Sequence, residues 1–243
     1  MLLDRYFESI DTLFQKVRET QREQIILAGE MIAASIEKGG CIHVGPICHG
    51  TEGDILYRGG GPLFYKRFAY TFNVDNNPRK RDRSDLDTNM EGFAAYVLKA
   101  SQARPGDVLI VSSVSGRSAN IVDLAYEAVR FGVKVIALTS LSYAMQVDAV
   151  HSSGKKLHEI VDLSIDNCAP AAEAMLEVDG IEARFAAASG IASDYILWSI
   201  TSVAVETLMA HGKTPGILKS ANFPGGNEYN KQVVEPQYEQ HGW

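Results

Sequence analysis

Residues 108–118 read VLIVSSVSGRS, an aliphatic run of four residues followed by a serine-rich segment. An aliphatic run without polar interruption is typical of a strand that is buried on both faces of a parallel sheet. Helical spacing follows over residues 119–131 and ends at Gly132, a residue type that commonly terminates helices. A second aliphatic run occupies residues 133–138. This order of strand, loop, helix and strand predicts two parallel strands joined by a helical crossover.

The same alternation extends to both sides of this unit. Cys41–Val44 is a short apolar run that predicts a strand, and we expect a helix from about Thr51 after the Gly45-Pro46 loop. Four further elements are expected: a strand at 68–74, a helix at 91–103, a strand at 160–165 and a helix at 191–210. The pattern predicts an α/β fold with a doubly wound, mostly parallel sheet flanked by helices. Ligands of such sheets bind beyond the carboxyl ends of the strands.

The two ends of the chain have contrasting patterns. From Leu3 to Lys38 apolar residues recur at helical spacing until Gly39-Gly40, which predicts a long leading helix over residues 1–38. That helix could pack on a partner subunit or cover its own sheet. Residues 213–243 are rich in Gly, Pro and Asn and predict an extended C-terminal tail. We expect a single domain over residues 1–243.

Composition excludes several classes of protein. The 243 residues carry a net charge of -7, whereas nucleic-acid binders normally present a basic face. The basic segment 79–83 is expected to be a solvated loop, with a subunit contact or a sugar-phosphate contact to a neighbouring chain as alternatives. No apolar run approaches the ~20 residues of a membrane span. The odd cysteine count, three, suits a reducing compartment, so we expect a cytoplasmic protein.

The serine-rich segment has the chemistry of an anion site. A helix that begins after a strand presents unpaired N–H groups and the positive end of its dipole. Gly116 permits a tight turn, and the neighbouring hydroxyls add donors without bulk. The alternative is that Ser118 only caps the helix. The Walker pattern and the dinucleotide-binding glycine pattern do not occur, which argues against the common nucleotide sites.

Residues 113–118, SVSGRS, resemble the Ser-x-Ser-Gly-x-Ser/Thr phosphate loop of sugar isomerase (SIS) domains. The chain is similar to a branch of this family that is related to phosphoheptose isomerases. The resemblance extends over nearly the whole chain, and the other matching stretches are Gly45–Gly61, Pro105–Ser140, Ser153–Leu157, Asp166–Pro170 and Ser220–Asn230.

This resemblance implies a five-stranded parallel sheet, a homodimer or homotetramer, and a sugar phosphate held at the strand carboxyl ends. The residues that it implies for substrate binding are Gly45, Ser112, Ser113, Ser115, Gly116, Arg117, Ser118, Ser140 and Ser189. The first loop departs from the family pattern Gly-x-Gly-His-Ser, since here Gly45 is followed by Pro-Ile-Cys-His-Gly. Gly190 also departs from the Ser-Thr that the family favours after the serine at position 189.

Aldose–ketose isomerisation needs a base that moves a proton between neighbouring carbons. Glu52 and Asp54 follow the first loop, and Asp54 falls where phosphoheptose-isomerase-like relatives keep a glutamate. His49 could open the sugar ring, and Glu206 is a weaker candidate base. Each of these residues could instead be structural, which is also our expectation for His158. We expect no metal and no other cofactor.

Three functions remain open at this point. The first is isomerisation of a sugar phosphate, of the heptose or amino-sugar class, through an enediol. The second is a phosphosugar sensor without catalysis, although the segment before Cys41 is too short and too acidic for the DNA-binding domain that such sensors carry. The third is a lyase that cleaves a sugar ether bond.

Overall fold

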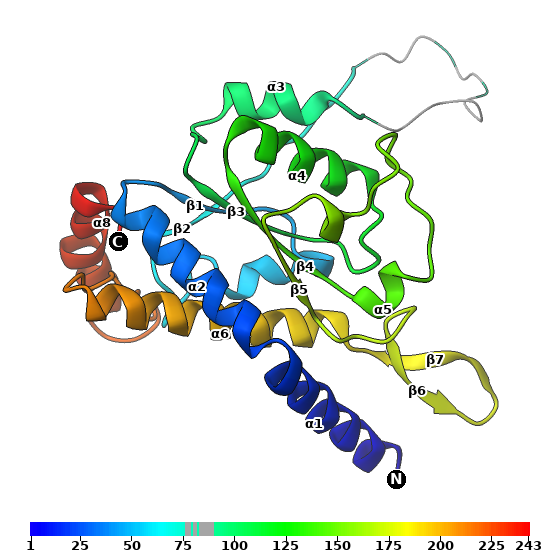
Figure 1. Ribbon diagram of the computed structural model, residues 1–243. Coiled ribbons are helices and arrows are strands. Elements are labelled where there is room, and N and C mark those ends of the chain that lie inside the picture. The colour runs from blue at the N-terminus through cyan, green and yellow to red at the C-terminus, as the bar shows by residue number, and fades with distance from the viewer. Residues whose placement is uncertain (76–78, 80–81, 83–89) are drawn as a thin grey trace.

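The computed structural model describes residues 1–75, 79, 82 and 90–243. Its centre is a five-stranded sheet with the order β2-β1-β3-β4-β5, in which all neighbouring strands are parallel (Figure 1). The strands are β1 Ile42–Val44, β2 Tyr65–Arg67, β3 Val108–Ser112, β4 Lys134–Thr139 and β5 Leu163–Asp166. β3 lies in the middle, and all of its residues are buried, as its aliphatic sequence predicts. The predicted fold class is confirmed.

Helices cover both faces of this sheet (Figure 1). α3 and α4 lie on one face, and α2 and α6 lie on the other. Their bounds are α2 Arg22–Glu37, α3 Phe93–Ala100, α4 Ala119–Phe131 and α6 Ser189–Ala210. Successive residues of β3 divide between the two cores: Val108 and Ile110 pack toward α2 and α6, whereas Leu109 and Val111 pack toward α3 and α4. Because all five strands are parallel, their carboxyl ends lie along one side of the sheet, which we call the carboxyl edge.

The leading helical segment is confirmed, but it is divided in two. α1 spans Leu2–Thr20, and the chain turns at Gln21, where φ is -117° and ψ is 4°, before α2 begins. The Gln21 side chain accepts a hydrogen bond of 3.0 Å from the Asp166 N–H, at the end of β5. A contact 145 residues away thus fixes the turn, and α1 projects beyond the sheet (Figure 1).

The region after β1 differs from the prediction in two places. The expected helix from Thr51 is a short 3-10 segment, Cys48–Asp54, with left-handed backbone at His49 and Gly50. The prediction of a strand at 68–74 is wrong. The strand lies earlier, at β2, and the chain leaves the sheet at Phe68. The Phe68 ring packs edge-on against the ring of His43, at 5.7 Å between centroids. Aromatic packing, rather than sheet pairing, therefore accounts for the apolar residues that follow β2.

An antiparallel hairpin that we did not predict follows β5. Its strands are β6, Ala174–Val178, and β7, Ile181–Ala187, and the turn between them contains Asp179 and Gly180. Asp-Gly between alternating residues is a strong hairpin signal. The hairpin extends from the carboxyl edge beside α1 (Figure 1).

The C-terminal tail is largely helical, so the prediction of an extended tail is corrected. It contains α7 Gly226–Tyr229, a π-helical turn Asn230–Val234 and α8 Glu235–His241. Val234 is fully buried, and the Lys66 ammonium lies 3.7 Å from the centre of the Tyr238 ring. These contacts with the body of the protein stabilise helices that the local Gly and Pro content disfavours.

Candidate functional site

Four loops and one helix end gather at the carboxyl edge. The loops follow β1, β3, β4 and β5, and the helix end is the N-terminus of α6. Two groups of side chains stand out there. We call Ser112–Ser118 the serine loop, and we call His49, Glu173 and Ser189 the histidine cluster.

The serine loop is folded by contacts among its own residues. The Gly116 N–H donates to the Ser113 carbonyl at 2.9 Å, and the Ser113 hydroxyl donates to the Ser118 hydroxyl at 3.1 Å. Ser118 occupies the N-cap position of α4, yet its side chain makes no capping hydrogen bond. A capping role alone therefore does not account for this serine.

Unused hydrogen-bond donors lie at the open side of the loop. In the part of the chain that the structure describes, the main-chain N–H groups of Ser115, Arg117, Ala119 and Asn120 have no hydrogen-bond partner. The Ser115 hydroxyl, half-buried, is likewise unpaired within those residues. Free N–H groups at the start of a 13-residue helix are suited to a dianion such as a phosphate ester.

Gly116 lies where a side chain cannot fit easily. Its φ of +67° is left-handed, and an added Cβ would lie 3.2 Å from the Thr139 hydroxyl and 3.4 Å from the Ala144 Cβ. The Gly116 carbonyl accepts a hydrogen bond of 2.8 Å from the Leu157 N–H. The glycine thus lets the loop pass between the end of β4 and the segment before β5.

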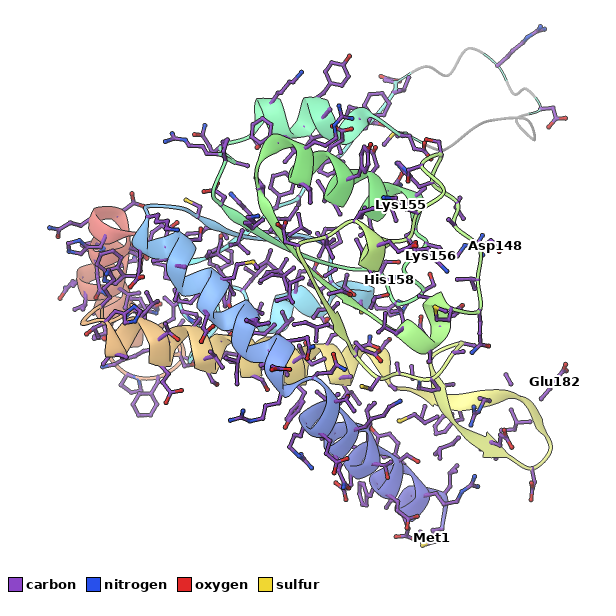
Figure 2. The ribbon with its side chains drawn as sticks, in the orientation of Figure 1. Met1, Asp148, Lys155, Lys156, His158 and Glu182 are labelled. Carbon is purple, nitrogen blue, oxygen red and sulfur yellow. The ribbon has the colours of Figure 1, made fainter. Side chains whose placement is uncertain are left out.

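Two groups beside the serine loop were not predicted as site residues. His158 lies 3.8 Å, by its Nδ1 atom, from the position of a Cβ at Gly116, and that nitrogen is buried without a partner among the described residues. The Lys156 ammonium donates to the carbonyls of Ala144 and Val147, at 2.6 and 3.2 Å. Figure 2 shows both side chains near the N-terminal end of α4. The sequence signal was the SGKKL stretch, which carries a basic pair but no indication of its place in the fold.

The Ser112 hydroxyl lies against the first loop, on the side of β3 that faces α6. Its hydroxyl lies 2.7 Å from the Cys48 sulfur, which in turn lies 3.4 Å from the Ser193 hydroxyl of α6. Burial raises the pKa of the Cys48 thiol, although the hydrogen bonds to both serines oppose that shift. Ser112 therefore connects the first loop to β3 and α6.

Two other predicted ligand residues have structural partners, and a third is exposed. The Gly45 N–H donates to the Ile110 carbonyl at 2.8 Å, and a Cβ there would lie 2.9 Å from Val111. The Ser140 hydroxyl is fully buried, donates to the Ala169 carbonyl at 2.7 Å and caps α5, Leu141–Ala144. Arg117 is exposed at the tip of the serine loop.

The histidine cluster joins three segments that are distant in sequence. His49 Nε2 lies 3.1 Å from Glu173 Oε2, and the Ser189 hydroxyl donates to the same oxygen at 3.1 Å. Glu173 follows the loop after β5, and Ser189 is the first residue of α6. The carboxylate is thus held at a helix N-terminus, where the dipole stabilises its charge. Sequence analysis predicted His49 and Ser189 but missed Glu173.

The predicted carboxylates of the first loop are engaged in other contacts. Asp54 accepts a hydrogen bond of 2.9 Å from the Trp198 indole through Oδ2, and its other oxygen pairs with Arg58. Glu52 accepts from the Ile47 N–H at 3.2 Å and lies 4.0 Å from Arg67. The structure therefore brings both acids near the carboxyl edge but gives each of them structural partners.

Three further predictions concern metal ligands, membrane helices and the basic segment 79–83. No group of three or more potential metal-ligating side chains occurs among the described residues. Within the same residues, no helix combines the length and the apolar character needed to cross a membrane. Most of the basic segment 79–83 lies outside the described residues.

Comparisons with known proteins identify the family and support the fold. Residues 5–140 match the model of the SIS domain. A UPF0309 protein of Streptomyces avermitilis is 33% identical over 235 residues, covering 96% of this chain and 94% of the relative. A UPF0309 protein of Shouchella clausii is 32% identical over 240 residues, with 96% and 95% covered. Phosphoheptose isomerase from Neisseria gonorrhoeae shares the fold, with a TM-score of 0.52, 17% identity, and 86% of this chain and 100% of that chain covered.

Proposed function

Because the chain belongs to the SIS domain family, we propose that it binds a sugar phosphate, with the phosphate held in the serine loop. The observation that supports this most strongly is the set of unpaired N–H groups and hydroxyls at the N-terminus of α4. The receptor contains no acidic side chain, and Lys156 places a positive charge nearby. Neutral donors at a helix N-terminus favour a sugar phosphate over the same sugar without its phosphate.

We further propose that the protein interconverts an aldose phosphate and a ketose phosphate of the heptose or amino-sugar class. A neighbour with the same fold is a phosphoheptose isomerase. The carboxyl edge supplies both an anion receptor and ionisable groups, and isomerisation needs only proton transfer. The reaction therefore requires no redox cofactor.

The experiment is a one-dimensional NMR screen of purified protein with sedoheptulose 7-phosphate, glucosamine 6-phosphate and fructose 6-phosphate. New sugar signals that depend on protein would support isomerisation. In a parallel incubation with a sugar phosphate that carries a lactyl ether, release of lactate would instead identify a lyase. Binding without any new signal would identify a sensor and contradict the isomerase proposal.

We propose that the protein is a homodimer or homotetramer in which a second copy covers α1 and the hairpin. A groove of about 530 Å³ lies between them and is lined by Leu2, Leu3, Tyr6, Phe185, Ala186 and Ala187. Phe7 and Phe185 are 56% and 51% exposed, which is unusual for phenylalanine unless a partner covers it. Light scattering should give a dimer or tetramer for the wild type and a monomer for Phe7→Glu with Phe185→Glu. A monomeric wild type at micromolar concentration would contradict the proposal.

We also propose a cytoplasmic location and one SIS domain over residues 1–243. The odd cysteine count supports the first, and the packing of α2, α6 and the C-terminal helices on one body supports the second. Cell fractionation tests the location. Limited proteolysis tests the domain, since a single unit should give no stable fragment that ends near residue 140.

A further inference from the structure

We infer that Glu173 is the base that moves the carbon-bound proton of the sugar phosphate, and that His49 passes the hydroxyl proton beside it. This inference rests on the proposed isomerase function and assigns its chemistry to residues that the family resemblance does not indicate. Four features of the molecule support this assignment: the orientation of the Glu173 carboxylate, the backbone conformation around it, the partners of the neighbouring carboxylates, and the link between His49 and the serine loop.

The Glu173 carboxylate is oriented but not fully used. His49 and Ser189 both contact Oε2, at 3.1 Å each, whereas Oε1 has no partner within residues 1–75 and 90–243. The side chain is 24% exposed, so the carboxylate remains accessible from solvent while Oε2 is held by its two partners. A carboxylate with one free, positioned oxygen is what proton abstraction from carbon requires.

The backbone around the cluster is held in sparsely populated conformations. Ala172 and Glu173 are consecutive residues with φ of +59° and +71°, and His49 has φ of +54°. Non-glycine residues adopt this region at an energetic cost, and such residues concentrate at active sites. Here both partners of the His49–Glu173 hydrogen bond have a left-handed backbone, so the fold maintains strain at the place where these two side chains meet.

Three other carboxylates near the carboxyl edge have structural partners. Asp54 holds Arg58 and Trp198, and Glu52 accepts from a main-chain N–H. Asp166 accepts from the N–H groups of Leu141 and Cys168, at 3.0 and 2.9 Å. Among these acids Glu173 is the one whose partners are a histidine and a hydroxyl.

The cluster is connected to the serine loop through the first loop. His49 directly follows Cys48, whose sulfur touches the Ser112 hydroxyl, and Ser112 is the first residue of the serine loop. A sugar phosphate bound by its phosphate at α4 can therefore extend toward α6, where Glu173 lies at the helix N-terminus.

The proton transfers balance without any added reactant. Glu173 removes the proton from C2 of the open-chain aldose, the C2–H electron pair forms the C1–C2 double bond, and the carbonyl pair moves to O1. Neutral His49 then takes the O2 proton through Nδ1 and delivers it to O1. Collapse of the O2 charge forms the C2 carbonyl, and C1 recovers the proton held by Glu173. Net movement is one hydrogen from C2 to C1 and one from O2 to O1.

The test measures turnover, and deuterium incorporation at C1 and C2 in D₂O, for sedoheptulose 7-phosphate and fructose 6-phosphate, which both carry oxygen at C2. Glu173→Gln keeps the hydrogen bonds to His49 and Ser189 but removes the base. We expect turnover and deuterium incorporation to fall at least about 100-fold, with the dissociation constant for the sugar phosphate within about threefold of the wild type. Glu173→Asp, which keeps the charge, should lose about tenfold. If the Glu173→Gln protein does not fold, the loss of turnover in the Glu173→Asp protein tests the assignment of Glu173 as the base.

Glu239→Gln is the matched control, because Glu239 is an exposed residue of α8, and α8 lies at the C-terminal end of α6, away from the N-terminus that holds Glu173 (Figure 1). It should match the wild type in binding, turnover and deuterium incorporation. A Glu173→Gln protein with turnover within tenfold of the wild type would overturn the base assignment and leave the isomerase proposal intact. A wild type that binds these sugar phosphates but exchanges no carbon-bound proton would overturn both.

Discussion

The serine loop and the histidine cluster both lie at the carboxyl edge, each at the N-terminus of a long helix, but their chemistry differs. The serine loop offers hydroxyls and main-chain N–H groups and no ionisable acid. The histidine cluster offers a carboxylate and an imidazole. The first arrangement holds an anion at any ordinary pH, whereas the second can accept and return a proton. Our proposals therefore assign binding and chemistry to separate helix termini.

Reversing the charge preference of the serine loop should have the largest effect on binding. Ser118→Asp places a carboxylate where the phosphate is proposed to lie. We expect the affinity for a sugar phosphate to fall at least 100-fold, about 2.7 kcal/mol, because like charges repel and the donors are occupied. Isothermal titration calorimetry measures the affinity of the Ser118→Asp protein for the sugar phosphate. Ser202→Asp, an exposed serine of α6, is the control.

Removing hydroxyls without adding charge should have a smaller effect. Ser115→Ala with Ser118→Ala should weaken sugar-phosphate binding about tenfold, or about 1.4 kcal/mol, because the N–H groups remain. The comparison of the two regions also predicts that KM rises while kcat stays near the wild type, the reverse of Glu173→Gln. Steady-state kinetics checks this. If the doubly substituted protein lost kcat and kept KM, the division between binding and chemistry would be wrong.

A side chain added at Gly116 should lower both the affinity for a sugar phosphate and the free energy of unfolding. Gly116→Ala and Gly154→Ala both place a side chain at left-handed φ, +67° and +69°, and each should lower the free energy of unfolding by about 1 to 2 kcal/mol. Gly154 has open space around its Cβ position, whereas Gly116 does not. Only Gly116→Ala should therefore weaken sugar-phosphate binding, by several-fold. Urea denaturation and titration calorimetry separate the two effects, and equal binding loss in both would count against a close fit at Gly116.

The smallest effect on turnover is expected at the first loop. Asp54→Asn removes the ion pair with Arg58 while the amide can still accept from Trp198. The free energy of unfolding should fall by less than about 1 kcal/mol, since the pair is partly exposed. Turnover should stay within about threefold of the wild type. A protein that folds and binds but has lost turnover would return the role of base to Asp54, the residue that sequence analysis favoured.

The serine loop and the central strands could be predicted from the sequence because each is contiguous. An aliphatic run, a glycine turn and a helix cap are local signals, and β3, α4 and Gly132 occur at the predicted positions. The hairpin could also have been found, since Asp179-Gly180 separates two β-rich segments. Local signals therefore suffice for the phosphate receptor and for most of the sheet.

The histidine cluster could not be predicted in the same way. His49 and Glu173 are 124 residues apart in the sequence. Both have a left-handed backbone conformation, which neither a histidine nor a glutamate predicts. The break at Gln21 has the same origin, because it depends on a hydrogen bond to Asp166 at the end of β5. The helical C-terminal tail likewise depends on burial of Val234 against the body. Tertiary contacts override local propensity at each of these places.

The most direct test of the account is a crystal structure of the protein soaked with fructose 6-phosphate. We predict that the phosphate lies within hydrogen-bond distance of the unpaired N–H groups at the start of α4 and of the Ser115 and Ser118 hydroxyls. The sugar should extend toward Glu173. Ligand bound elsewhere with the serine loop empty, or bound with its phosphate away from α4, would contradict the central claim.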